Sequence, residues 1–447
     1  MSVTSYLERD GGRPGPAASG TSGRDGALLQ EETLDSLVTV LDAIRLGRAR
    51  SRGEIVARTG LTRSVVARRV GELIEHGLVA EGETGPSTGG RPPRHLAFRA
   101  DAGHLLVADL GATSVIAAVA ALDGRVLAHR DAPLDIAVGP DAVLARLDTM
   151  FDEVRAECAS LPGRLWGLGI GLPGPVEFDA GRPISPAIMP GWDGYPVRDR
   201  LAKRYSAPVW VDNDVNVLAL GELRSGVAAN HEDVVVLKIG TGIGAGIISD
   251  GHLHRGAQGS AGDVGHSPVS DDPSIVCRCG RTGCLEALAG GHALARDGEA
   301  AARDGTSPAL AAILERRGSL TTDDVVAAAS AGDAAATGLL RAAGRRVGLM
   351  LAGIVNFFNP SLIIIGGRVG LHADAMVASI REVVHERALP LATHDLLIRR
   401  SSLGGLAGVT GCSAMVVDQL FAREPLARWL AAGEPAGMPE VVLAGRG

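Results

Sequence analysis

The sequence predicts an α/β protein that joins an N-terminal winged helix-turn-helix unit to a larger domain. Its 447 residues exceed one ordinary domain. From about residue 103, apolar strands punctuated by glycine alternate with Ala- and Leu-rich helices, as in α/β domains. Composition breaks predict a disordered leader at 1–30, a winged helix-turn-helix domain at 31–100, an α/β domain at 101–425 and a C-terminal tail at 426–447.

Two segments of the larger domain have the same pattern. The stretches beginning at His104 and at Val234 both indicate a strand, a glycine-containing turn, a strand and an Asp-Gly turn. This pattern favours two related halves that face each other across a cleft. A chance similarity over so short a stretch is the alternative.

Charge is unevenly distributed along the chain. The net charge is −7, yet residues 48–99 hold ten Arg against five Glu. This local excess is typical of a nucleic-acid contact or of a solvated charged face. Lysine occurs only at Lys203 and Lys238, which we interpret as compositional bias. The sequence shows neither a secretory signal nor a long apolar run, so we expect a cytoplasmic protein without a membrane segment.

The segment 51–80 predicts a helix-turn-helix. One short helix ends at a glycine, and Thr62 can cap the next helix through its hydroxyl. The second helix has a buried stripe of Val66, Val70, Leu73 and Ile74, and its opposite face carries Arg63, Ser64 and Arg68. That face fits a recognition helix in the DNA major groove, with Arg69 beside the stripe as a phosphate contact at best. An ordinary two-helix corner with solvated arginines is the alternative.

A wing-like segment follows the second helix. The polar run 82–93 contains Arg91 between Gly90 and Pro92. An extended backbone with little bulk beside the arginine suits insertion into a narrow minor groove. Its position directly after the second helix favours the DNA-binding interpretation.

Three of the five cysteines lie within eight residues, and this clustering indicates a metal site. Cys277, Cys279 and Cys284 have the spacing C-x-C-x4-C, with glycines that allow a tight loop. Three thiolates and one imidazole make a closed tetrahedral zinc site with a structural role. We favour His266 as the fourth ligand, with His252 and His254 as nearby alternatives. Buried free cysteines are the remaining alternative.

Acidic and glycine-rich segments predict a small-molecule site. Asn213 and Asp214 follow an apolar strand, where ligands bind in α/β domains, and either residue can instead cap the next helix. Asp109 is placed to face a metal–phosphate, and the loop Gly240–Gly246 can cradle phosphate through its backbone N–H groups. That loop leads into a strand, which excludes a Rossmann motif.

Taken together, these strings resemble the ROK family of repressors, open reading frames and kinases, over residues 34–420. The most specific strings are CRCGRTGCLE with GDVGH upstream, GLPGPV, PGWDG, DNDVN and IIIGG, and the N-terminal helix-turn-helix with STGGRP resembles the repressor branch. The resemblance implies a two-lobed actin-like ATPase fold and zinc on His266 and the three cysteines. It also implies sugar contacts from Asn213, Asp214, Asp263, His266 and Glu286, with Asp214 as the base in the family's kinases.

The chain departs from the kinase pattern at its first phosphate motif. Kinases of the family have Gly-Gly-Thr-Lys where this chain has Gly111, Ala112, Thr113 and Ser114. The second phosphate motif, Gly240, Thr241 and Gly242, is intact. Use of ATP and Mg²⁺ therefore stays open. Asp263 replaces a usual Glu and Ala187 a frequent Asn, so the sugar preference is expected to differ from that of glucose kinases.

The sequence thus predicts a DNA-binding regulator of carbohydrate genes, chiefly a repressor, controlled by a sugar or amino sugar. A homodimer or homotetramer is expected, because a palindromic operator offers two half-sites. The alternatives are an ATP-dependent sugar kinase with an accessory DNA-binding domain, and a regulator that answers to a protein partner.

Overall fold

The chain divides into two compact units. The computed structural model describes residues 21–84, 94–158 and 161–442. The smaller unit takes in residues 1–75 and 81–97, and the larger takes in 76–80 and 98–447. The boundary therefore lies within a few residues of the predicted one at 100.

Within its described residues, the smaller unit has three helices and two paired strands. Its elements are α1 (Thr21–Arg45), α2 (Arg52–Thr59), α3 (Arg63–Glu75), β1 (Val79–Thr84) and β2 (Arg94–Phe98). Gly60 ends α2 with φ +70°, a left-handed conformation that favours glycine and redirects the chain into α3. This is the predicted helix–turn–helix with the strand pair of a wing. Residues 1–20 of the expected leader and Arg91 lie outside the described residues.

Two sequence-based expectations for this unit need correction. Helix α1 begins at Thr21, whereas the sequence predicted a disordered segment to residue 30 and helix from about Leu34. The stretch that follows Gly26 is rich in Ala, Leu and Gln, which favour helix, and this extends the periodic segment toward the N-terminus. Arg69 is buried and not a flanking phosphate contact. Its guanidinium donates to Ser36 Oγ at 2.8 Å and pairs with Glu72, because Arg69 lies one turn after Val66 on the face that packs on α1.

The first lobe of the larger unit is a five-stranded sheet in the order β5-β4-β3-β6-β9. Strands β3 and β4 and strands β4 and β5 are antiparallel, whereas β3, β6 and β9 run parallel. Helices α4 and α5 pack on one face through apolar residues such as Leu147 and Leu201. The bounds are β3 (Gly103–Leu110), β4 (Ser114–Ala121), β5 (Val126–Pro133), α4 (Pro140–Glu157), β6 (Arg164–Leu172), β7 (Val176–Glu177), β8 (Arg182–Pro183), α5 (Val197–Tyr205) and β9 (Val209–Asn213).

The second lobe repeats this topology. Its sheet has the order β12-β11-β10-β13-β14, with an antiparallel β10-β11-β12 meander and a parallel β10-β13-β14 set. The identical arrangement agrees with the two related halves predicted from the sequence. The bounds are β10 (Val234–Ile239), β11 (Ile243–Ser249), β12 (His252–His254), α7 (Leu285–Ala289), α8 (Gly291–Arg303), α9 (Pro308–Arg317), α10 (Thr322–Ser330), α11 (Ala334–Phe358), β13 (Leu362–Gly366), α12 (Gly367–His372), α13 (Asp374–Arg387), α14 (Pro390–Thr393) and β14 (Leu397–Arg400).

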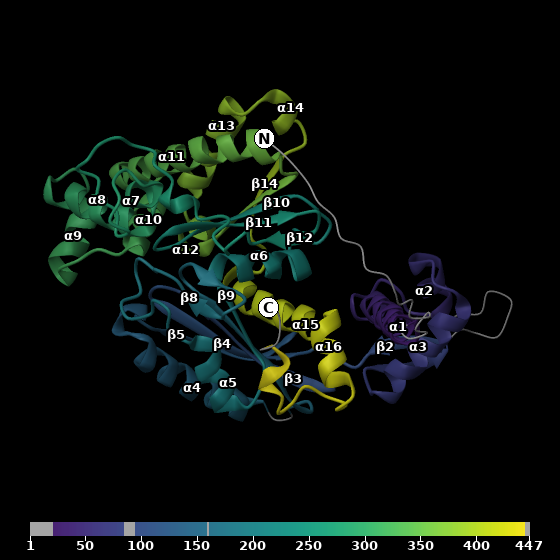
Figure 1. The fold of residues 1–447 in the computed structure, drawn as a ribbon. Helices are drawn as coiled ribbons and strands as arrows, with labels where there is room; N and C mark the ends of the chain where they lie inside the picture. The colour runs from purple at the N-terminus through teal and green to yellow at the C-terminus, as the bar shows by residue number, and fades with distance from the viewer. Residues whose placement is uncertain (1–20, 85–93, 159–160, 443–447) are drawn as a thin grey trace, which may run out of the picture. The chain divides into compact units, whose positions relative to one another are not determined.

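Two helices lie between the sheets of the larger unit. These are α6 (Asp214–Ser225) and α15 (Ala407–Leu420), and Figure 1 shows them between the lobes, with α11 and α13 on the far side of the second sheet. They cross with their backbones almost in contact, because a Cβ built on Gly411 would lie 1.5 Å from Val217 O. Glycine is therefore required where the two helices meet.

The described part of the segment expected as a C-terminal tail, residues 426–442, contributes to the packed domain. Helix α16 (Arg423–Leu430) places Trp429 in full burial, with its ring 5.4 Å from that of Trp166 and its Nε1–H donating to Leu420 O at 2.8 Å. The sequence offered only a short apolar run there, whereas the aromatic partners come from distant parts of the chain. Among the described residues no single helix is long and apolar enough to cross a membrane, although the bent pair Gly404–Leu420 and Arg423–Leu430 meets the length and composition criteria jointly.

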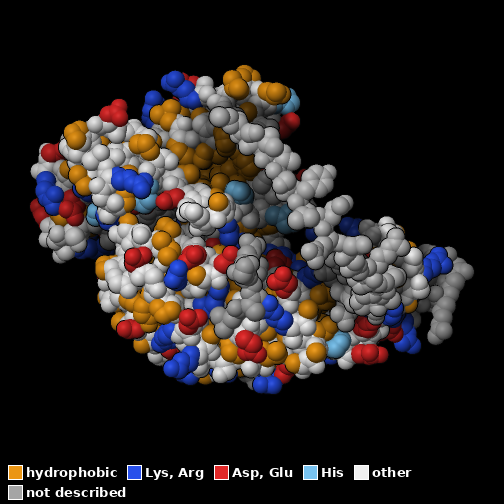
Figure 2. Space-filling view, viewed as in Figure 1, with side chains coloured by type: hydrophobic (Ala, Val, Ile, Leu, Met, Phe, Trp, Pro, Cys, Tyr) orange, Lys and Arg blue, Asp and Glu red, His pale blue; other side chains and the backbone are white. Residues whose placement is uncertain are grey.

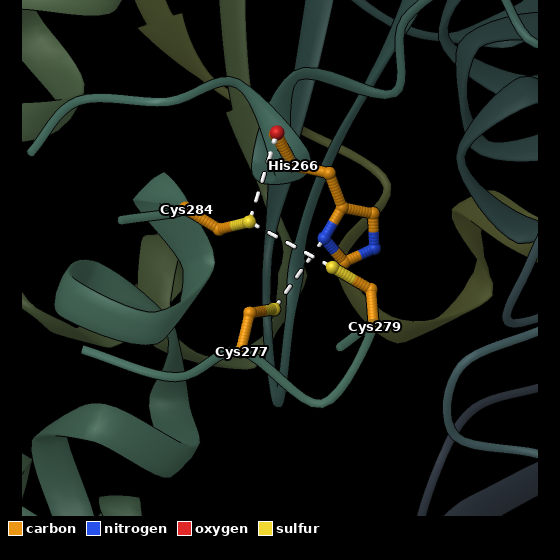
Figure 3. A group of neighbouring side chains, drawn as sticks. All are labelled: His266, Cys277, Cys279 and Cys284. Atoms are coloured by element: carbon orange, nitrogen blue, oxygen red, sulfur yellow. Dashed lines mark hydrogen bonds between the residues drawn. The ribbon is translucent and has the colours of Figure 1, made fainter. Parts of the chain in front are cut away.

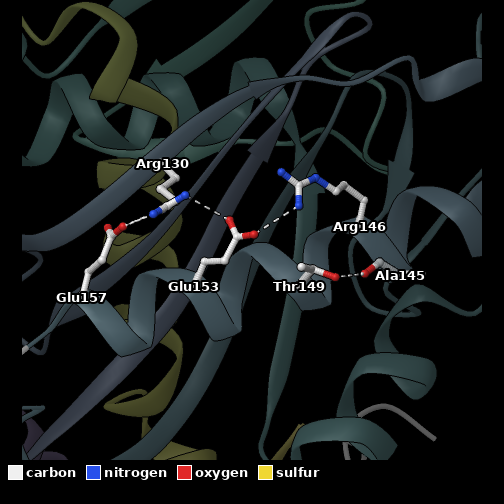
Figure 4. A network of polar contacts seen from close by, with 6 residues as sticks. All are labelled: Arg130, Ala145, Arg146, Thr149, Glu153 and Glu157. Carbon is white, nitrogen blue, oxygen red and sulfur yellow. Dashed lines mark hydrogen bonds and ion pairs between the residues drawn. The ribbon is translucent and has the colours of Figure 1, made fainter.

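Surface ion pairs tie some elements together. Arg130 of β5 lies between Glu153 and Glu157 of α4, and Arg146 contacts Glu153 from two turns earlier on α4 (Figure 4). All of these side chains are at least one-third exposed, so the network adds little to stability.

Candidate functional site

A cavity of about 700 Å³ opens between the two lobes of the larger unit. The sequence-predicted ligand and phosphate residues all line it: Asp109, Gly111, Thr113, Asn213, Asp214, Gly240, Thr241, Gly242, Asp263, His266 and Glu286. Most come from the ends of β3, β9 and β10 and the turns that follow these strands, whereas Asp263 and His266 lie in the loop after β12 and Glu286 lies on α7. The cavity is of the size that small-molecule ligands fill.

Asn213 and Asp214 have different roles at the start of α6. Asn213 is the helix N-cap, because its Oδ1 accepts the N–H of Val215 at 2.9 Å. Its Nδ2 also donates to Gly174 O at 2.9 Å, so both ends of this amide are already bonded. The capping alternative considered for these residues is thus the observed role of Asn213. Asp214 begins the helix and is largely buried, with its carboxylate at the cavity wall.

Lys238 faces this carboxylate and was missed by the sequence reading. Its Nζ lies 2.8 Å from Asp214 Oδ2 and 3.9 Å from Asp109 Oδ2. Burial alone would lower the pKa of Lys238, but the two carboxylates raise it above its ordinary value. Burial also raises the pKa of Asp109 to about 6, against the opposing effect of the lysine charge. The only available signal in the sequence was that this chain has just two lysines and one lies in a buried strand.

The two glycine turns are partly closed by their own hydrogen bonds. The N–H of Gly111 donates to Ser114 O at 2.7 Å, and that of Gly240 donates to Gly242 O at 3.0 Å. Glu286 lies beneath the second turn, where its Oε2 accepts the N–H of Ile243 at 3.1 Å. A Cβ on Gly242 would lie 2.1 Å from that oxygen, so glycine is required there for close approach.

The predicted zinc ligands gather into one cluster. The ligand atoms of His266, Cys277, Cys279 and Cys284 all lie within 4.8 Å of one another (Figure 3). Cys279 Sγ is 3.7 Å from Cys284 Sγ, and Cys277 Sγ is 3.6 Å from His266 Nδ1. A tetrahedral zinc ion with bonds of about 2.0–2.3 Å places its ligand atoms roughly 3.6–3.8 Å apart. These four side chains therefore fit a metal ion with three sulfur ligands and one nitrogen.

His266 connects this cluster to the cavity. Its Nδ1 faces the sulfurs, whereas its Nε2 lies 4.0 Å from Asp263 Oδ1 on the cavity side. One imidazole can thus serve the metal and the cavity through different nitrogens. Asp263 is exposed, so its carboxylate is free to meet a ligand.

The smaller unit presents the predicted recognition face. Arg63, Ser64 and Arg68 are exposed on α3, whereas Val66, Val70 and Leu73 are buried, and Ser64 and Arg68 lie on the opposite side from this buried stripe. Thr62 Oγ1 accepts the N–H of Val65 at 3.4 Å, which is the predicted N-terminal cap. Ion pairs in this unit engage other arginines, Arg45, Arg52, Arg69 and Arg94.

Comparison with known proteins gives the family. The ROK family matches residues 106–419, and the IclR helix-turn-helix domain matches residues 33–82. This chain belongs to the ROK family. Its larger unit has the two-lobed sugar-kinase-like fold of that family, joined to an N-terminal helix-turn-helix.

The similar proteins include regulators and kinases. The chain is 31% identical over 397 residues to a xylose repressor of Caldicellulosiruptor bescii, covering 88% of this chain and 97% of the repressor. A crystal structure of a ROK family transcriptional regulator, a homologue of the Escherichia coli Mlc protein, matches with TM-score 0.73 and 25% identity over 92% of this chain and 99% of that one. A ROK glucokinase from Streptomyces griseus in complex with glucose and AMPPNP matches with TM-score 0.63 and 27% identity over 70% and 99%.

Proposed function

We propose that this ROK protein is a DNA-binding transcriptional regulator, most simply a repressor of carbohydrate genes, whose affinity for its operator changes when a sugar binds. The observation that carries the proposal is the extent of the match. The similarity to a xylose repressor spans 88% of the chain, whereas the glucokinase leaves 30% uncovered. The helix-turn-helix match at 33–82 supports DNA as the partner, with action in the cytoplasm.

The proposed DNA contact is helix α3 in the major groove. Arg63 and Arg68 are exposed on α3 and can bind guanine edges or phosphates, as can the exposed Ser64 at the start of the helix. Arg91, outside the described residues, remains a proposed minor-groove contact. Phosphate contacts make affinity fall with salt, so removing one arginine should reduce the slope of log K against log salt by about one.

A homodimer is proposed because a palindromic operator presents two equal half-sites. A patch of exposed apolar residues on the second lobe is compatible with a protein contact. Phe357 and Leu391 are more than 90% exposed, and the N–H of Leu389 donates to Asn356 Oδ1, which joins the end of α11 to α14. Figure 2 shows hydrophobic side chains gathered near α14. Sedimentation of the purified chain gives its oligomeric state.

A gel shift with DNA from upstream of the protein's own gene tests the regulator. We expect the protein to retard the DNA at about 0.1 M salt, and Arg63→Ala and Arg68→Ala to weaken this retardation. The control Arg316→Ala, on α9 of the larger unit, should leave it unchanged. No retardation of any upstream fragment at micromolar protein would overturn the proposal.

The proposed effector is a sugar or amino sugar in the cavity. Asp214 and Asp263 offer carboxylates to ligand hydroxyls, and His266 offers Nε2. A sugar alters DNA binding only if it favours one arrangement of lobes or subunits over another. Thermal-shift screening of monosaccharides and amino sugars identifies the ligand, and Asp214→Asn should remove the shift. If the protein binds DNA but no sugar changes its melting temperature, a protein partner and not a sugar would regulate its DNA binding.

The metal that we propose at the cysteine cluster is structural zinc. Four protein ligands leave no open position for water, so the ion would tie the loop 266–284 together and take no part in chemistry. The purified protein should contain close to one equivalent of zinc by elemental analysis. Zinc-free protein of native stability would exclude this assignment.

A sugar kinase is the alternative activity, and the similarity to glucokinase and the position of Asp214 favour it. Ala112 and Ser114 stand against it, because the first phosphate motif of the kinases is altered. ADP release with a sugar panel, abolished by Asp214→Asn, is the measurement that would establish it.

A further inference from the structure

Asp109 and Lys238 occupy equivalent positions in the two halves of the larger unit. Asp109 lies on β3, pairs in register with Gly171 of β6 and precedes a glycine turn by two residues. Lys238 lies on β10, pairs with Gly366 of β13 and precedes the second glycine turn by two residues. The repeat therefore places an acid and a base opposite each other at the bottom of the cavity.

The ammonium group of Lys238 lies between two carboxylates. It is bonded to Asp214 Oδ2 at 2.8 Å and is 3.9 Å from Asp109 Oδ2. All three side chains are less than one-fifth exposed, which strengthens their mutual attraction. A cation held at this place by two acids neutralises charge that would otherwise be left buried.

The same two acids are the groups that a metal–nucleotide would need. The fold family implies a Mg²⁺-bound nucleotide in its kinases, and Mg²⁺ requires oxygen ligands at about 2.0–2.1 Å in near-ideal octahedral geometry. Here Asp214 Oδ2 already accepts a hydrogen bond from Lys238 Nζ, and the lysine charge would repel a divalent cation. Asp109, Asp214 and Lys238 therefore do not fit a Mg²⁺-bound nucleotide.

We infer that Lys238 takes the place of a divalent cation between Asp109 and Asp214, so that the cavity binds its ligand without metal or nucleotide. The ammonium supplies the positive charge that balances both acids. It also occupies the Asp214 oxygen that faces it, which keeps that carboxylate from acting as a proton acceptor there. The inference goes beyond sugar sensing and does not depend on DNA binding.

Manganese binding tests the inference, with the second lysine as a matched control. Lys203 is exposed on α5 and does not line the cavity that holds the two acids, so Lys203→Thr should behave as the wild type. In zinc-loaded full-length protein, we expect the electron paramagnetic resonance signal of free Mn²⁺ to be unchanged by wild type and Lys203→Thr up to about 1 mM. Lys238→Thr should bind Mn²⁺ at least tenfold more tightly. Equal binding by the three proteins, whether tight or weak, would overturn the inference.

A measurement on the wild type alone covers the case in which Lys238→Thr does not fold. Trace acetylation followed by mass spectrometry compares the two lysines in one molecule. We expect Lys203 to react and Lys238 to be protected, equally with and without Mg²⁺ and AMPPNP. If Mg²⁺–AMPPNP raises the reaction at Lys238, the metal displaces the lysine and the inference is wrong. Sugar binding and DNA retardation are scored separately, so failure of the proposed function is distinguished from failure of this inference.

Discussion

Arg255 joins the two lobes beside the cavity, and replacing it with methionine measures how much that contact stabilises the larger unit. Arg255 directly follows β12 in the second sheet, and its Nε lies 2.8 Å from Oδ2 of Asp212 on β9 of the first sheet. Its guanidinium also lies over the ring of Phe178, 4.0 Å from the centroid. Asp212 is only 1% exposed, so without Arg255 its carboxylate would be left buried without an ion-pair partner.

The magnitude follows from what the carboxylate keeps and loses. Asp212 Oδ1 still accepts the N–H of Asn213 and the amide of Asn216, both at 2.8 Å, whereas Oδ2 loses its arginine. Removing one partner of a buried ion pair costs about 3–5 kcal/mol, and the partial exposure of Arg255 favours the lower value. We expect a loss of about 3 kcal/mol, or a melting temperature lower by roughly 4 °C for a unit of this size.

Differential scanning fluorimetry of Arg255→Met and Arg182→Met makes the comparison. Arg182 pairs with Glu177 where both side chains are nearly half exposed, so its loss should cost less than about 1 kcal/mol. Arg255→Met should also weaken the sugar-induced shift, because the pair holds the strand end that leads to Asp214. Equal melting temperatures for the two variants would refute the reasoning.

Three further results are expected. Gly411→Ala should lower the free energy of urea unfolding by about 3–5 kcal/mol, because its Cβ meets Val217 O. Gly353→Ala on α11 has open space around it and should raise that free energy by up to about 1 kcal/mol. Similar values for both variants would contradict the helix crossing. The pKa of Asp109 is raised to about 6, so the folded state binds this proton more tightly than the unfolded state does. The ionised carboxylate therefore destabilises the folded protein above pH 6, and protonation relieves this cost as the pH falls toward 4. From pH 7 to pH 5, the free energy of unfolding of the wild type should therefore rise by about 1 kcal/mol relative to that of Asp109→Asn. Parallel pH profiles for the two proteins would exclude the raised pKa. Cys279→Ser should reduce the zinc content well below one equivalent and lower the melting temperature, whereas Cys158→Ser, far from the cluster in sequence, should do neither.

The sequence was most informative where the interacting residues are close in the chain. The four residues of the metal-ligand cluster all lie between 266 and 284, and the spacing of the three cysteines predicted that they gather. The turn at Gly60 and the cap at Thr62 are also local, and both were predicted. The repeated strand–turn–strand pattern was enough to predict two halves, because a hairpin pattern is itself local.

The residues that were misread have partners far away in the sequence. The partner of Arg69 is Ser36, 33 positions earlier, and periodicity gives the face of a helix without saying what covers it. Trp429 is buried against Trp166, more than 250 positions earlier. The role of Asn213 as a cap was one of two locally reasonable alternatives, and only the position of Gly174 O shows that its amide nitrogen is also occupied.

Lys238 shows how the repeated topology makes a long-range contact that no single half encodes. Each half alone has one charged residue at the end of its first strand, and either would be a buried charge without a partner. Closing the two halves over one cavity brings the charges together, and Asp214 at the start of α6 completes the set. On electrostatic grounds, a lysine at this position opposes the binding of a divalent cation between Asp109 and Asp214.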